Sequence, residues 1–280
     1  MKLYPILTGN LKLDGGAMFG VVPKVIWNRL YPSDENNLCN WAMRCLLIVD
    51  GDRKILIDSG VGDKQNDKFF SHYYLNGDDT LEKSLAKLGY TTDDITDNIL
   101  THLHFDHVGG SVKYNSNNEL VPTFKNATFW VSKAQWEWAT KPNRREKASF
   151  LKENIIPIIE KAKINFIEKE SEILPNIYAK IFNGHTDGQI IPCITYKGKQ
   201  IAFMGDLLPS AAHIPMPYVM SYDTRPLLTL KDKERFFKDA LSSDTILFFE
   251  HDLYNECCNL HETDKGVRLK ESFTLEEYFS

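Results

Sequence analysis

The segment Thr101–Gly110 has the sequence THLHFDHVGG, in which three histidines and one aspartate fall within six residues. Imidazole nitrogens and carboxylate oxygens are ligands that zinc, manganese and iron accept. His102 and His104 are two residues apart at the end of a predicted strand, so both side chains face the same way and can bind one cation. Asp106 and His107 follow where the chain must turn, within reach of a second cation. The segment therefore predicts a metal site.

Three further candidate ligands follow apolar runs later in the chain: His185 in NGHTDGQ, Asp206 in FMGDLLP and His251 in FFEHD. Strand ends are where layered proteins present functional loop residues. The two oxygens of a carboxylate such as Asp206 can bridge two cations. The five cysteines include no CxxC pair, which argues against a closed structural zinc and indicates buried free thiols.

The elements before these residues have strand and helix signals that place the candidate ligands in loops. Cys45–Val49 and Lys54–Asp58 are predicted strands joined by an Asp-Gly turn. Leu81, Leu85 and Leu88 have helical spacing, and the short strand NILTHLH follows. The predicted strand ends where the histidines begin.

The second half of the chain alternates in the same way. ATFWVSKAQWEWA predicts a strand and then a helix capped by Ser132, and Leu151–Phe166 predicts a helix that Pro157 kinks or interrupts. From Ile177 onward four strands are expected, with a helix over Leu230–Leu241 between the last two. No repeat or long linker is present, so one compact domain of layered α/β or α+β type is expected.

The composition agrees with a globular protein: 280 residues, 42% hydrophobic and 25% charged, with a formal net charge of −5. This charge gives no general attraction to nucleic acid. The N-terminal apolar run is too short for a signal peptide, and no stretch reaches the length of a membrane span. A cytoplasmic protein without a membrane or nucleic-acid partner is expected.

His102–His107, HLHFDH, resembles the HxHxDH signature of the metallo-β-lactamase fold superfamily. His185, Asp206 and His251 occur in the expected order, and IDSG with Asp58 is similar to the earlier strand end of that family. The resemblance extends from Cys45 to His251. It implies an α+β fold, a four-layer αββα sandwich, with residues 1–280 as a single hydrolase domain.

The resemblance also implies a dinuclear site with two divalent metal ions, zinc first and iron or manganese as alternatives. In this pattern Asp206 bridges the metals, Asp58 supports the ligands from behind, and the remaining ligands are His102, His104 and His185 for the first metal and Asp106, His107 and His251 for the second. A hydroxide shared by the metals is the implied nucleophile. Asp106 could pass a proton to the leaving group.

GDLLPSAAHIPMPYVMSYDTRP and DGGAMFGVVPKVIW are similar to the branch that contains YtnP-type quorum-quenching lactonases and methyl parathion hydrolase. Well-known lactonases have a substrate-contacting tyrosine where this chain has Pro209, so His213 or Tyr222 is expected to replace that donor. The candidate residues for substrate contact are Met18, Phe19, Phe105, His213 and Tyr222.

The resulting hypothesis is a hydrolase that opens lactones or cleaves related esters of a small-molecule substrate. A phosphotriesterase-like hydrolase is the alternative, and a non-catalytic metal-binding member is less favoured because no ligand is missing. A class B β-lactamase is disfavoured because Asp206 stands where these enzymes commonly have cysteine. HTDGQ differs from the HTPGH of glyoxalase II at Asp187 and Gln189, which disfavours a glutathione thioester. A homodimer is compatible with the resemblance.

Overall fold

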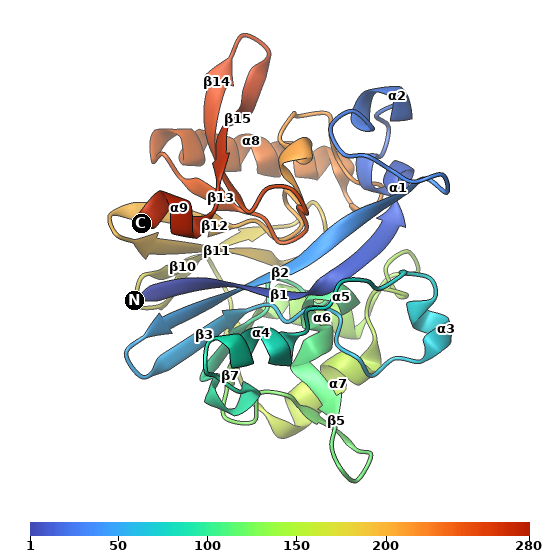
Figure 1. The fold of residues 1–280 in the computed structure, drawn as a ribbon, viewed down its shortest axis with the longest axis vertical. Coiled ribbons are helices and arrows are strands. Elements are labelled where there is room, and N and C mark those ends of the chain that lie inside the picture. Colours follow the sequence, from blue (N-terminus) through green and yellow to red (C-terminus); the bar gives the residue numbers. More distant parts are fainter. The chain divides into compact units, whose positions relative to one another are not determined.

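The computed structural model describes all residues from Met1 to Ser280, and the chain divides into two compact units. Unit 1 contains residues 1–11 and 43–169, and unit 2 contains residues 12–42 and 170–280. Figure 1 shows the elements of both. The expectation of a single domain over residues 1–280 stays a prediction.

Unit 1 is built on a six-stranded sheet of order β1-β2-β3-β4-β7-β8. Its strands are β1 (Lys2–Asp14), β2 (Leu38–Asp50), β3 (Arg53–Ile57), β4 (Asp97–Ile99), β7 (Thr128–Ser132) and β8 (Lys163–Ile167), and a separate hairpin joins β5 (Val112–Tyr114) to β6 (Leu120–Pro122). The expected hairpin is present, since β2 and β3 pair in antiparallel fashion. β3, β4, β7 and β8 are parallel neighbours, so the segments after β3 and β4 leave the sheet at the same edge.

The helices of unit 1 are α3 (Asp67–Phe70), α4 (Leu81–Lys87), α5 (Phe105–Val108), α6 (Lys133–Thr140) and α7 (Lys152–Lys161), with 3-10 turns at Thr92–Asp94 and Gly109–Ser111. Ser132 caps α6 as expected, because its side chain accepts from the Gln135 N–H. The core of this unit contains Leu56, Leu85, Phe129 and Ile158, all fully buried.

The prediction of one helix over Leu151–Phe166 is wrong. α7 ends at Lys161, and Lys163–Ile167 is β8, parallel to β7. Pro157 lies inside α7 and is buried, so it does not end the helix. The apolar residues of KINFI fit a helical period and a strand alternation equally well, and pairing with β7 decides in favour of the strand.

Unit 2 is built on a seven-stranded sheet of order β15-β14-β13-β12-β11-β10-β9. Its strands are β9 (Ser171–Leu174), β10 (Ile177–Phe182), β11 (Gln189–Tyr196), β12 (Lys199–Phe203), β13 (Ile246–Phe248), β14 (Cys257–Thr263) and β15 (Gly266–Phe273). β12 and β13 are parallel, and β10 runs in the same direction because it is separated from β12 by the antiparallel β11. The segments after β10, β12 and β13 therefore leave this sheet at one edge, and these segments carry His185, Asp206 and His251.

The helices of unit 2 are α1 (Gly15–Phe19), α2 (Lys24–Trp27), α8 (Pro226–Ser242) and α9 (Leu275–Phe279), with a 3-10 turn at Ala211–His213. The expected helix over Leu230–Leu241 lies within α8, which packs on the sheet through Phe236, Phe237 and Ala240 (Figure 1). All five cysteines are buried and free, as expected. No helix is long and apolar enough to cross a membrane.

Candidate metal centre

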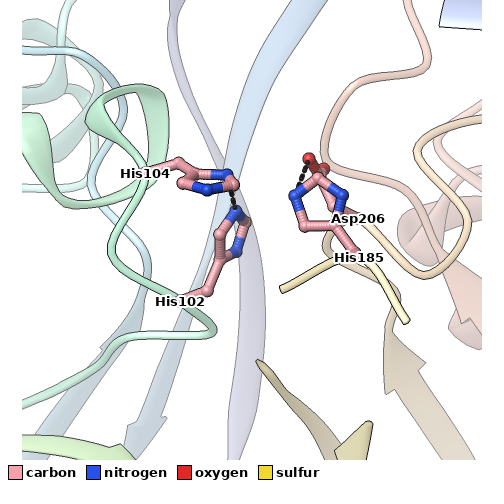
Figure 2. A group of neighbouring side chains, drawn as sticks. All are labelled: His102, His104, His185 and Asp206. Atoms are coloured by element: carbon pink, nitrogen blue, oxygen red, sulfur yellow. Dashed lines mark hydrogen bonds and ion pairs between the residues drawn. The ribbon is translucent and has the colours of Figure 1, made fainter. Parts of the chain in front are cut away.

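His102 and His104 lie close together at the sheet edge of unit 1. His102 Nε2 is 3.0 Å from His104 Nδ1, and Figure 2 shows this contact as a dashed line between the two rings. Both residues follow β4, and both are buried. The two rings present nitrogens to the same point, as the two-residue spacing predicts.

Asp58 and Thr101 determine which nitrogen of His102 carries the proton. The Thr101 hydroxyl donates to Asp58 Oδ2 at 2.6 Å, and the Thr101 N–H donates to Asp58 Oδ1 at 2.8 Å. Because the hydroxyl hydrogen is used in this way, the Thr101 oxygen accepts from His102 Nδ1 at 3.1 Å. His102 Nε2 is then unprotonated and has its lone pair for a metal.

His107 and His104 are oriented by carboxylates of the same unit. His107 Nδ1 donates to Asp58 Oδ2 at 3.0 Å, and His104 Nε2 lies 3.4 Å from Glu146 Oε1. Glu146 is itself fixed, since its other oxygen accepts from Trp138 Nε1 and Asn143 Nδ2, each at 2.6 Å. Asp106 Oδ2 lies 3.8 Å from His107 Nε2. Asp58 thus contacts the predicted ligand His107 directly and the predicted ligand His102 through Thr101.

The close approach of two loops in unit 1 explains the glycine pair of the motif. Ser59 donates to the His107 carbonyl through its N–H at 2.8 Å and its hydroxyl at 2.9 Å. A Cβ on Gly110 would lie 2.2 Å from the Ser59 carbonyl oxygen, and one on Gly109 would lie 2.1 Å from that of Val61. Only glycine allows this contact between the segment after β3 and the histidine motif.

Unit 2 brings its three candidate ligands together. Asp206 Oδ2 is 3.1 Å from His185 Nε2, and Asp206 Oδ1 is 3.1 Å from His251 Nε2; Figure 2 shows the His185 contact. The far nitrogen of each ring is held, because His185 Nδ1 donates to Asp223 Oδ1 at 2.8 Å and His251 Nδ1 donates to the Ala42 carbonyl at 2.8 Å. The Nε2 lone pairs therefore face the Asp206 carboxylate.

These donors have the chemistry of ligands for divalent cations. The inner atoms are imidazole nitrogens with lone pairs and carboxylate oxygens, and at about 3 Å such atoms repel one another unless a positive charge lies between them. An acceptor on the far nitrogen is the usual arrangement for a histidine that binds a metal. His102, His104, His185 and Asp206 are all buried, so desolvation adds to the need for a cation.

Phe105 lies among aromatic side chains of unit 1. Its ring centroid is 5.2 Å from that of Phe69 and 4.6 Å from that of Tyr73. Burial raises the pKa of the Tyr73 phenol, and the nearby Asp106 carboxylate raises it further. Tyr73 is therefore protonated and has a donor close to a predicted metal ligand.

Of the other residues predicted to touch substrate, Met18, Phe19 and His213 are almost completely buried in unit 2. The Phe19 ring stacks on His213 with centroids 4.7 Å apart. His213 Nε2 donates to the Met18 carbonyl at 2.9 Å, and His213 Nδ1 accepts from the Ser210 hydroxyl at 2.8 Å. Burial lowers the pKa of His213 to about 3. The ring is neutral and both nitrogens are occupied, so His213 is a poor substrate donor here, whereas Tyr222 is 41% exposed.

Sequence reasoning missed four residues of the site: Thr101, Glu146, Asp223 and Tyr73. Thr101 had a usable signal, since it directly precedes the histidine motif at a strand end. Glu146 and Asp223 lie 42 and 38 residues from the histidines that they contact. Polar loops without periodicity carry both, so no pattern in the sequence links them to the site.

Comparisons with known proteins agree with this geometry. The family model of the metallo-beta-lactamase superfamily matches residues 44–251. An N-acyl homoserine lactonase of Bacillus cereus is 25% identical over 268 residues, which are 91% of this chain and 94% of that protein. The crystal structure of a probable metal-dependent hydrolase from Staphylococcus aureus has a TM-score of 0.86 at 28% identity and covers 98% of both chains.

A dizinc quorum-quenching lactonase, AidC, in complex with the product N-hexanoyl-L-homoserine, has a TM-score of 0.79 at 21% identity and covers 97% of this chain and 95% of that one. The chain belongs to the metallo-β-lactamase superfamily and has its fold. The expectations of this family, of its α+β fold and of a metal-dependent hydrolase are confirmed. Among the relatives are N-acyl homoserine lactonases, the branch that the sequence indicates.

Proposed function

We propose that this protein is a dinuclear metal-dependent hydrolase that opens lactones, with N-acyl homoserine lactones as its substrate class. The observation that carries the proposal is the state of the five motif histidines. In each, an acceptor occupies one ring nitrogen and leaves the opposite nitrogen for a metal. The names of the relatives, N-acyl homoserine lactonase and dizinc quorum-quenching lactonase, support the substrate class.

In the proposed assignment the protein binds two divalent cations, with zinc as the first metal to test. Following the family pattern, His102, His104 and His185 would hold one cation, Asp106, His107 and His251 would hold the other, and Asp206 would be a ligand of both. The family model covers all seven residues.

The bound cations would polarise the lactone carbonyl and lower the pKa of a bound water. The protein's own side chains would transfer the proton, bind the substrate carbonyl and contact the acyl chain. Asp106 is 13% exposed, so solvent and substrate can reach it, and its carboxylate would take the proton of the attacking water and pass it to the leaving ring oxygen. Tyr73 and Tyr222 are the candidate donors to the substrate carbonyl in place of the tyrosine that Pro209 replaces. Phe105 and Phe69 would form an apolar surface for the acyl chain.

The test is acid release from a long-chain acyl-homoserine lactone by metal-loaded protein, followed with a pH indicator. We expect native protein to release acid, whereas Asp206→Ala and His185→Ala should remove the activity and lower metal occupancy without unfolding the protein. Exposed Asp264→Ala is a matched control that should keep both properties. Full activity of chelator-treated, metal-free protein would contradict the metal mechanism.

Failure of protein with both metals bound to open any lactone of this class would overturn the lactonase assignment while leaving the metal site standing. The same samples should then be tested with phosphotriesters and other esters, the alternative substrates that the sequence indicates.

A further inference from the structure

A cavity lies entirely within unit 1. Its volume is about 330 Å³, which is at the lower end of small-molecule pockets. Its walls come from β1, the segment after β3, the residues around α3 and the start of α4, and the chain that follows the histidine motif. None of the seven predicted metal ligands lines it.

Thr123 gives the cavity an unsatisfied polar atom. This residue lines the cavity and is 2% exposed, and its hydroxyl has no hydrogen-bond partner. Its N–H is already used, since it donates to the Ser111 carbonyl at 2.9 Å. A buried hydroxyl without a partner costs free energy that a bound polar group would recover.

The charged residues of the cavity are mostly acidic. Asp63, Asp79 and Glu82 line it together with one cationic residue, Lys113. Asp79 is paired with Lys87 Nζ at 2.6 Å, whereas Asp63 and Glu82 form no ion pair. The nearby Lys64 interacts electrostatically with Asp63, although its ammonium donates its hydrogen bond to the Gly109 carbonyl. A cationic ligand would supply the ion-pair partner that Glu82 lacks.

The remaining wall is apolar. Val61, Leu81 and Val112 are buried and line the cavity with Met43 and Phe70. These side chains leave room for a short hydrocarbon chain beside the carboxylates.

We propose that this cavity binds a small aliphatic amine that also carries a hydroxyl or carbonyl group. Its ammonium contacts Asp63 and Glu82, its chain packs on Val61, Leu81 and Val112, and its second polar group bonds the Thr123 hydroxyl. The site is separate from the metal centre and does not depend on the proposed lactonase activity.

The cavity also contacts the support of the metal ligands. Ser59 lines it and bonds the His107 carbonyl through both its N–H and its hydroxyl. Gly110, another lining residue, donates to the Gly60 carbonyl at 2.9 Å. An occupant would therefore rest against the segments that orient Asp58 and His107.

The probe is 4-amino-1-butanol, titrated into the full-length protein and followed by ligand-observed NMR. Two probes each lack one group: butylamine has no hydroxyl, and 1,4-butanediol has no ammonium. We expect 4-amino-1-butanol to bind more tightly than either. Asp206→Ala should bind it equally well, which separates the cavity from amine binding at the metal centre.

Three substitutions test the individual contacts. Thr123→Val keeps the shape of the side chain and should lower the affinity for 4-amino-1-butanol about fivefold, while the affinity for butylamine should not change. Glu82→Gln should lower the affinity for both amines about threefold and should not change the affinity for 1,4-butanediol. Lys113→Met should raise the affinity for both amines by a similar factor, because it removes a positive charge that repels the ammonium.

Thr123→Val also checks that the protein is intact, since the loss of an unsatisfied hydroxyl should not lower the melting temperature. Equal affinity for butanediol and the amines, or no effect of Thr123→Val on 4-amino-1-butanol, would overturn the proposal. Absence of binding by either amine at tens of millimolar would also overturn it.

Discussion

The Asp223 carboxylate has one clear task at the level of single residues: it holds the proton of His185 on Nδ1. We expect Asp223→Ala to lower metal affinity about 10- to 100-fold, because the ring loses both its orientation and its tautomer preference. Competition with a chromophoric chelator measures this. Asp187→Ala is the matched control, since Asp187 is two residues from His185 but its carboxylate accepts from Arg225 Nη1 at 3.0 Å. Equal metal affinity in Asp223→Ala and native protein would show that the contact is not functional.

Tyr73 provides a second test at this scale. Loss of its hydroxyl in Tyr73→Phe should lower kcat/KM for a lactone about tenfold or more if the phenol donates to the reacting carbonyl. KM alone should change little. Tyr74→Phe is the control, because Tyr74 is adjacent and 55% exposed. An unchanged kcat/KM in Tyr73→Phe would leave Tyr222 as the candidate donor.

The sequence could predict the inner residues of the site but not their partners. The motif of three histidines and an aspartate can be found in the sequence, and so can the residues at three later strand ends. Strand periodicity and loop position are patterns of neighbouring residues, so they can be recognised locally. Glu146 and Asp223 depend on how distant loops fold, which no local pattern encodes. The structure likewise changes the interpretation of His213, whose burial and two ring contacts could not be read from its position in the chain.

Among the elements, α8 contains an unusual buried lysine. Lys233 is 1% exposed, and its ammonium donates to the carbonyls of His213, Pro215 and Tyr218 at 2.7, 2.9 and 3.1 Å. It thereby fixes the segment that follows the 3-10 turn. Burial lowers the pKa of Lys233 to about 7, against a partial opposing effect of Asp223.

This lowered pKa has a consequence for stability. Between about pH 7 and the ordinary lysine pKa of about 10.4, the unfolded chain binds more protons at this residue than the folded protein does. The contribution of Lys233 to the free energy of unfolding should therefore rise with pH through this window. Denaturant titrations at several pH values should show this rise in native protein and its loss in Lys233→Met. Parallel pH profiles of the two proteins would contradict the assignment.

Local patterns predicted most elements near the site and failed where two periods compete. The β2–β3 hairpin, α4, α6 and the strands from Ile177 to Phe248 follow from turn residues, caps and apolar runs. β8 was read as helix because its apolar residues fit both periods. β1 and the β14–β15 hairpin were not predicted, because β1 and β15 are mostly only partly buried and none of the three strands has a clean alternation of buried and exposed residues.

For the whole molecule, metal binding and folding should be linked. Ligands that bind only the folded state stabilise it by about 2.7 kcal/mol at a concentration one hundred times Kd. For a chain of this size, removal of the metals should lower Tm by roughly 5 to 10 °C. Differential scanning calorimetry with and without chelator measures the change. Asp206→Ala should show a smaller chelator effect, and an equal effect in both proteins would mean that the stabilising ion binds elsewhere.

The amino-acid composition predicted the general class of protein but not its metal or its substrate. Length and apolar content indicated a globular protein, and the structure has a buried apolar core in each unit. The identity of the native metal and the physiological substrate depend on a few side chains around the site, to which the overall composition is insensitive.

Asp58 has a backbone conformation that lowers the stability of the fold and a side chain that supports the predicted metal ligands. Its φ of 56° lies in the left-handed region, which costs a non-glycine residue on the order of 1 kcal/mol. The same residue orients Thr101 and His107. Populations selected only for thermal resistance should therefore replace Asp58 with asparagine, which adopts this backbone conformation more readily and keeps a side-chain acceptor for Thr101, whereas populations selected for turnover should keep Asp58. The residue found at position 58 would therefore indicate whether a population was selected for stability or for turnover.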